Sequence, residues 1–105
     1  MVEKRIYPYK VDTVFKFLKD ICGKSPFVVK TVDESVHQII ISTRPSLLSY
    51  GENIEIIVQP EGDNETLVYI KSEPKAFFNI TAKHTIKRNV QSIYRMLEEM
   101  LHKNI

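Results

Sequence analysis

Apolar residues recur at helical spacing in two stretches of this chain, one early and one at the end. The early stretch, 11–22, has an apolar stripe of Val11, Val14, Phe15, Leu18, Ile21 and Cys22. The late stretch, 85–103, has a seam of Ile86, Val90, Ile93, Leu97, Met100 and Leu101, flanked by Tyr94. Such stripes are typical of amphipathic helices that bury one side. The chain therefore has two predicted helices, near its two ends.

The residues between the two helices are β-branched or alternate between apolar and polar. This pattern predicts strands over residues 27–32, 36–43, 53–59 and 65–72, and a short first strand is predicted over 4–9. In the third of these segments Ile54, Ile56 and Val58 share one face, while Ile57 lies on the other. Residues 33–35 and 60–64 have the composition of turns. Residues 73–81, interrupted by Pro74, are not assigned.

The predicted order is β-α-β-β-β-β-α within a single domain spanning residues 1–105. Consecutive hairpins build one antiparallel sheet, and each helix needs a sheet face against which to bury its stripe. The fold class is therefore α+β, with both helices packed on one face of the sheet. A domain of this size has little room for a large cavity beside its core.

Composition and charge narrow the functional classes. The chain has 15 basic and 13 acidic residues, a balance that makes nucleic acid an unlikely partner. Its single cysteine, Cys22, cannot form an intramolecular disulfide and is expected at the core edge. The first residues lack an apolar signal segment, and no apolar run is long enough to span a bilayer. A cytoplasmic location is expected.

The order of elements, together with the phrase Ser49-Tyr50-Gly51-Glu52, resembles the TATA-binding-protein-like and Bet v 1-like (START-like, helix-grip) fold group. The phrase is similar to one in small uncharacterised bacterial domains. The resemblance implies a sheet gripped by a long C-terminal helix. No catalytic residue of that group maps onto this sequence.

Motifs for catalysis, metals or cofactors are absent from the sequence. His37, His84 and His102 have no partner at metal-ligand spacing, and no nucleophile-elbow motif is present. Glu98 and Glu99 fall on the polar side of the last helix and are interpreted as solvated charges. These observations favour a protein that is not an enzyme, without a catalytic residue, metal or cofactor.

We expect a binding module for a small apolar or amphipathic ligand, held between the last helix and the sheet. The candidate ligand-binding residues are Tyr50, Phe77, Phe78, Tyr94 and Met100. The same side chains could instead fill an ordinary core. The segment containing Arg44, Ser49, Tyr50, Glu52 and Asn53 could form a binding rim. Alternatively Gly51 makes a turn, Tyr50 packs on the helix, and Glu52 and Asn53 satisfy backbone groups.

Two surface features offer alternatives. Lys83, Lys87 and Arg88, at the start of the last helix, could form an anion site or, less favourably, contact nucleic acid; they could also be a solvated basic face. Ile57 and Tyr69 lie on the sheet face away from the helices, where they could form a protein or homodimer interface. Ordinary scattered exposure would explain them equally well.

Overall fold

The computed structural model describes residues 1–44, 51–75 and 82–103, with side chains from residue 87 onward in the last segment. In chain order the elements are β1 (Val2–Tyr7), α1 (Val11–Cys22), β2 (Phe27–Asp33), β3 (Gln38–Thr43), β4 (Glu52–Pro60), β5 (Thr66–Pro74) and α2 (Ala82–Lys103). The predicted β-α-β-β-β-β-α order is confirmed.

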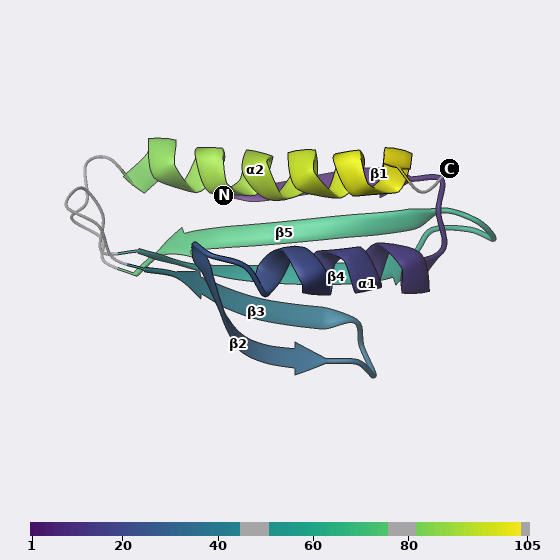
Figure 1. The fold of residues 1–105 in the computed structure, drawn as a ribbon, viewed down its shortest axis with the longest axis horizontal. Coiled ribbons are helices and arrows are strands. Elements are labelled where there is room, and N and C mark those ends of the chain that lie inside the picture. The colour runs from purple at the N-terminus through teal and green to yellow at the C-terminus, as the bar shows by residue number, and fades with distance from the viewer. Residues whose placement is uncertain (45–50, 76–81, 104–105) are drawn as a thin grey trace.

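The five strands form one antiparallel sheet in the order β1-β5-β4-β3-β2. Both helices lie on the same face of this sheet, with α2 over β1 and β5 and α1 in front of β4 (Figure 1). The predicted α+β arrangement is therefore confirmed. β1 joins the sheet beside β5, so the first and last strands are neighbours although they are far apart in the sequence.

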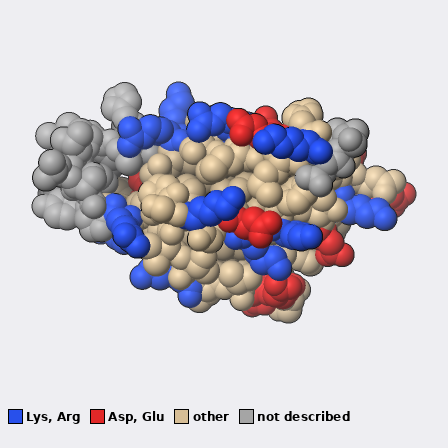
Figure 2. Space-filling model, viewed as in Figure 1, with Lys and Arg blue, Asp and Glu red and all other residues tan. Residues whose placement is uncertain are grey.

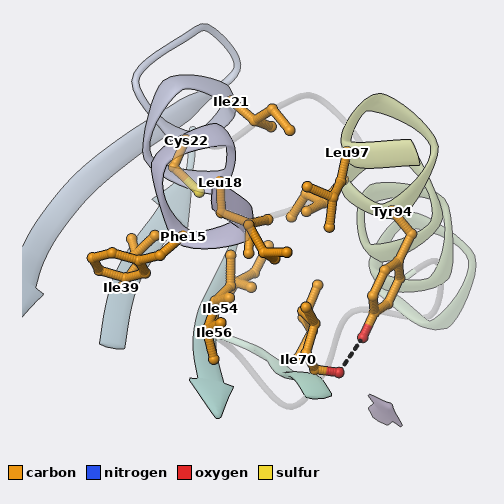
Figure 3. Close-up of a cluster of buried hydrophobic side chains, with 14 of the residues drawn as sticks. Phe15, Leu18, Ile21, Cys22, Ile39, Ile54, Ile56, Ile70, Tyr94 and Leu97 are labelled. Atoms are coloured by element: carbon orange, nitrogen blue, oxygen red, sulfur yellow. Dashed lines mark hydrogen bonds between the residues drawn. The ribbon is translucent and has the colours of Figure 1, made fainter. Parts of the chain in front are cut away.

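The helix-covered face of the sheet carries the core (Figure 3). Ile54, Ile56 and Val58 point to this face from β4, as their alternation predicted, and each is almost completely buried. They pack among apolar residues of both helices, including Leu18 and Leu97. Full burial of one such side chain contributes about 1.5–3 kcal/mol, so this layer is the main source of stability.

Element boundaries differ from the prediction by a few residues, for local reasons. β1 ends at Tyr7 rather than at residue 9, because Pro8 has no N–H to donate to the sheet. β3 begins at Gln38 rather than at residue 36, because His37 has a positive φ of 52° and belongs to the turn. The register between β2 and β3 shifts between Val29 and Thr31, a β-bulge that contains Lys30.

Candidate functional site

The helix-covered face of the sheet is mostly apolar, but two groups of polar residues lie on it beneath α2. Under the start of α2 lie Thr43, Glu52 and Ser72, which are all buried. Under the rest of α2 lie the inward-facing residues of β1, Glu3, Arg5 and Tyr7. We name the first group, with Asn89, the Glu52 cluster. The second group, with Gln91 and Glu98, is the Arg5 cluster.

Glu52 is the first residue of β4, and only 1% of its surface is exposed. Its carboxylate oxygen Oε1 accepts a hydrogen bond from Nδ2 of Asn89 on α2. Its backbone N–H donates to Oγ1 of Thr43, at 2.9 Å. The carboxyl group therefore lies inside the protein, between the sheet and the helix.

Ser72 lies beside Glu52 on the same face. The register pairs Ile54 with Ser72 and Glu52 with Pro74, so Ser72 is one inward-facing step from Glu52 across the β4–β5 pair. Ser72 is fully buried, and its Oγ has no hydrogen-bond partner among the described residues. An unpaired buried hydroxyl destabilises a folded protein by about 1–3 kcal/mol, so the presence of Ser72 at this position needs an explanation.

Gly51 allows the chain to enter β4 in this way. Its φ is +91°, a conformation that residues with a Cβ rarely adopt. A Cβ on Gly51 would lie only 2.5 Å from the carbonyl oxygen of Thr43. Glycine therefore brings the start of β4 close to the end of β3 and turns the Glu52 side chain inward. The interpretation of Gly51 as a turn residue stays a prediction, because residues 45–50 lie outside the described part of the chain.

Two basic residues, Lys75 and Arg88, belong to the surroundings of the Glu52 cluster. Nζ of Lys75 donates to the carbonyl oxygen of Thr43 at 3.3 Å, and its backbone N–H donates to Gly51 at 3.0 Å. Burial raises the pKa of Glu52, while the hydrogen bond from Asn89 and the charge of Arg88 act in the opposite direction. Lys75 and Arg88 are both exposed. The Glu52 cluster thus has a buried acceptor and positively charged surroundings.

The Arg5 cluster joins β1 to α2 by charged hydrogen bonds. Arg5 donates from Nη1 to Glu98 at 2.6 Å and from Nη2 to Gln91 at 2.9 Å, and its guanidinium lies 4.3 Å from the ring centre of Tyr94. The hydroxyl of Tyr7 also donates to Glu98, at 2.7 Å. Open grooves of about 500 Å³ and 520 Å³ adjoin Arg5 and Glu98.

Glu98 was interpreted as a solvated charge, and it is partly exposed, but its carboxylate is also hydrogen-bonded to Arg5 and Tyr7. Burial alone would raise its pKa, but the hydrogen bonds from Tyr7 and Arg5 outweigh burial and lower it. Glu99, in contrast, is exposed as expected. Since Arg5 is also paired with Glu3, at 3.2 Å, its charge is balanced within the protein. The cluster fastens the helix to the first strand, and we assign no ligand to it.

Two of the five predicted ligand residues lie in described parts of the core. Tyr94 is fully buried, and its hydroxyl donates to the backbone carbonyls of Glu3 and Val68; the hydrogen-bonded hydroxyl is visible in Figure 3. Met100 is partly buried and packs against the core. Tyr50, Phe77 and Phe78 lie outside the described residues. The middle and the C-terminal part of α2 are thus well packed against the sheet.

The predicted surface residues are placed as follows. Lys87 and Arg88 are exposed on α2, and Figure 2 shows Lys and Arg side chains along this side of the molecule. The side chain of Lys83 lies outside the described residues. Ile57 and Tyr69 are direct cross-strand partners on the outer face of the sheet, and both are half-buried.

The remaining candidates have local structural roles. His37 packs edge-on against Phe15, with ring centres 5.0 Å apart, and its Nε2 lies 3.7 Å from Asp12. Burial raises the pKa of the Cys22 thiol to about 12, so it is a protonated core residue. In the described parts of the chain, no three His, Cys, Asp or Glu side chains come together to hold a metal ion.

This arrangement is that of a Bet v 1-like, START-like fold, in which a long C-terminal helix packs across an antiparallel sheet. The predicted resemblance to that group is confirmed by solved structures. No family model matches the sequence, and no curated protein matches it. The fold is therefore established by structural similarity rather than by sequence.

Three solved structures illustrate the similarity. The di-domain ARO/CYC StfQ from the steffimycin biosynthetic pathway matches with a TM-score of 0.67 and 11% identity, over 92% of this chain and 43% of that chain. Ara h 8.0201 matches with a TM-score of 0.67 and 12% identity, over 98% and 97% of the two chains. TTHA0849 from Thermus thermophilus matches with a TM-score of 0.58 and 15% identity, over 94% of each.

These identities show a shared fold and nothing about a shared ligand or reaction. The chain spans less than half the length of StfQ. Within the described residues, neither helix has the length and apolar character needed to cross a membrane.

Proposed function

We propose that the protein is a binding module for a small apolar or amphipathic molecule, held between the start of α2 and the sheet. The observation that carries this proposal is the burial of Glu52 and Ser72 on the helix-covered face. Along the rest of that face, β3, β4 and β5 contribute mainly packed aliphatic side chains. Beneath the start of α2, Glu52 and Ser72 are the polar groups to which a ligand could hydrogen-bond.

The energetics support this location. A buried carboxyl and an unpaired buried hydroxyl are both unfavourable unless they gain a partner. A ligand that hydrogen-bonds to them would recover that free energy, whereas the fully buried Tyr94 has already used its hydroxyl. The sequence places Tyr50 two residues before Glu52, and it places Phe77 and Phe78 between β5 and α2. We propose these three aromatic residues as the apolar part of the site.

We propose binding rather than catalysis. Glu52 is hydrogen-bonded to the neutral side chain of Asn89. Ser72, a buried hydroxyl on the same face, has no described base hydrogen-bonded to it that could activate it as a nucleophile. The cluster is thus suited to binding a polar group of a ligand. Catalysis would need an additional side chain that acts as a base.

An NMR titration with anilinonaphthalene sulfonate, a fluorescent apolar anion, tests the location. We expect the largest amide shift changes at Glu52, Ser72 and Asn89. The outer-face residues Ile57 and Tyr69 serve as the internal control and should not shift. Shifts confined to the outer face, or no binding, would contradict the proposed site.

A second candidate function is homodimerisation through the outer face of the sheet. Ile57 and Tyr69 face one another across β4 and β5. Val2 and Ile6 of β1 lie on the same face, and each is 52% exposed. Contiguous exposed apolar residues of this kind are typical of interaction surfaces. The charged residues among them include Lys71 and Glu55, which are cross-strand partners of opposite sign, and Lys4, whose Nζ lies over the ring of Tyr69.

A further inference from the structure

We propose that the ligand presents a hydroxyl group to Glu52 and Ser72 at its buried end and an acidic group to Lys75 and Arg88 at its outer end. This inference rests on the proposed binding function and specifies the chemical class of the ligand. The class is an apolar molecule with a hydroxyl at one end and a carboxylate at the other.

The buried end requires a hydrogen-bond donor. An ionised carboxyl group only accepts hydrogen bonds, and its two oxygens have about four lone-pair sites. Among the described side chains, Asn89 alone donates to Glu52. A ligand group placed directly against the Glu52 carboxylate must therefore be a hydrogen-bond donor.

Ser72 distinguishes a hydroxyl from an amine. Its Oγ is buried without a described partner, and a serine hydroxyl can both donate and accept. A ligand hydroxyl can donate to Glu52 while it accepts from Ser72. An ammonium group can only donate, so it would leave the hydrogen of Ser72 unsatisfied. The pair of protein groups is thus complementary to a hydroxyl.

The surrounding charge supports the same choice. Nζ of Lys75 donates to the carbonyl oxygen of Thr43, and the Thr43 hydroxyl accepts a hydrogen bond from the backbone N–H of Glu52. Arg88 is close enough to lower the pKa of Glu52. Arg88 near the buried carboxyl, together with Lys75 on the neighbouring carbonyl of Thr43, disfavours a cationic ligand and favours an anionic group at the solvent-facing end.

Four probes of similar shape separate these requirements. A hydroxynaphthoic acid carries a hydroxyl group and a carboxylate at opposite ends of the ring system. Naphthoic acid lacks the hydroxyl group, and naphthol lacks the carboxylate. The aminomethyl analogue of naphthoic acid replaces the hydroxyl by a cation. By isothermal titration calorimetry, we expect hydroxynaphthoic acid to bind about tenfold more tightly than naphthoic acid, as one hydrogen bond of about 1.4 kcal/mol implies. The aminomethyl analogue should bind most weakly.

Glu52→Gln tests the buried end, since Gln keeps an acceptor for Asn89 but loses the second carboxylate oxygen. We expect the preference for hydroxynaphthoic acid over naphthoic acid to disappear. Glu55→Gln, on the same strand but on the outer face, is the matched control and should keep it. Should Glu52→Gln fail to fold, Ser72→Ala provides a second test with the same expected loss.

Lys75→Gln and Arg88→Gln test the outer end. Each should weaken binding of hydroxynaphthoic acid several-fold while leaving the affinity for naphthol unchanged. Lys71→Gln on the outer face should leave both affinities unchanged. An unchanged hydroxyl preference in Glu52→Gln and Ser72→Ala, or tightest binding of the aminomethyl analogue, overturns the ligand class. The proposed function would survive that result if anilinonaphthalene sulfonate still binds at Glu52. Failure of every probe, including that one, overturns both.

Discussion

The hydroxyl oxygen of Tyr94 lies 2.8 Å from the backbone carbonyl oxygen of Glu3, a residue 91 positions earlier in the chain. The same hydroxyl donates to the carbonyl of Val68 at 3.1 Å, so one side chain of α2 links β1 and β5. A tyrosine hydroxyl has only one hydrogen, which the two carbonyls share. Burial of the ring raises the pKa of Tyr94 and keeps this hydrogen in place.

Tyr94→Phe should lower the free energy of unfolding by about 1–2 kcal/mol, because both carbonyls lose a buried donor while the ring still fills the core. Urea denaturation followed by circular dichroism measures the change. Tyr69→Phe is the control, because that ring lies half-buried on the outer face beneath Nζ of Lys4. Equal stability of the two variants would show that the Tyr94 hydroxyl does not hold the strands.

Glu98→Gln should destabilise the protein at neutral pH by about 1 kcal/mol or less, since the ion pair with Arg5 is partly exposed. The folded-state pKa of Glu98 is lowered, so its contribution is complete above the ordinary value of about 4.3 and is lost as pH falls through the folded-state value. The difference from the wild type should therefore shrink below about pH 4.

Glu99→Gln, the adjacent exposed carboxylate, is the control for this pH series. Thermal unfolding at several pH values would show whether the Glu98 effect is specific. A difference that stays constant from neutral to acidic pH would rule out the ion pair as its cause.

Gly51→Ala should be more destabilising than Gly62→Ala. Both glycines have positive φ, +91° and +96°, so both substitutions strain the backbone by about 1 kcal/mol or more. A Cβ at residue 51 would also meet the carbonyl oxygen of Thr43, whereas nothing lies within 4 Å at residue 62. The difference in unfolding free energy between the variants isolates this close contact, and equal values would argue against it.

Ile57→Glu tests homodimerisation without disturbing the core. If copies associate through the outer face, the wild type sediments as a dimer and Ile57→Glu as a monomer, because a buried unpaired carboxylate is unfavourable. Tyr69→Glu should have the same effect, whereas Lys103→Glu, at the exposed end of α2, should not. A monomeric wild type at high concentration would remove this candidate.

Hydrophobic periodicity predicted the fold because β4 and both helices have strong, regular patterns. The alternation of Ile54, Ile56 and Val58 identified the buried face of β4. The same alternation, extended by one step toward the N-terminus, would also have placed Glu52 inward. That signal was missed because Gly51 and Glu52 have the composition of a turn, so the predicted strand began at residue 53.

The Arg5 cluster could not be predicted in the same way. Arg5 and Glu98 are separated by 93 residues, and only Glu98 was assigned a surface in advance, the polar side of the last helix. Their contact depends on the pairing of β1 with β5, which local patterns do not specify. Long-range polar contacts of this kind need the register of the whole sheet.

The β-bulge at Lys30 has a consequence for the behaviour of the protein at high concentration. β2 is an edge strand, and its Val28, Val29 and Val32 are exposed. A regular edge with such side chains could recruit a strand from another molecule and start the growth of aggregates. The bulge interrupts the row of backbone groups, and Lys30 adds a charge within it. This edge is thereby a poor template for intermolecular strand addition, which favours solubility over polymerisation.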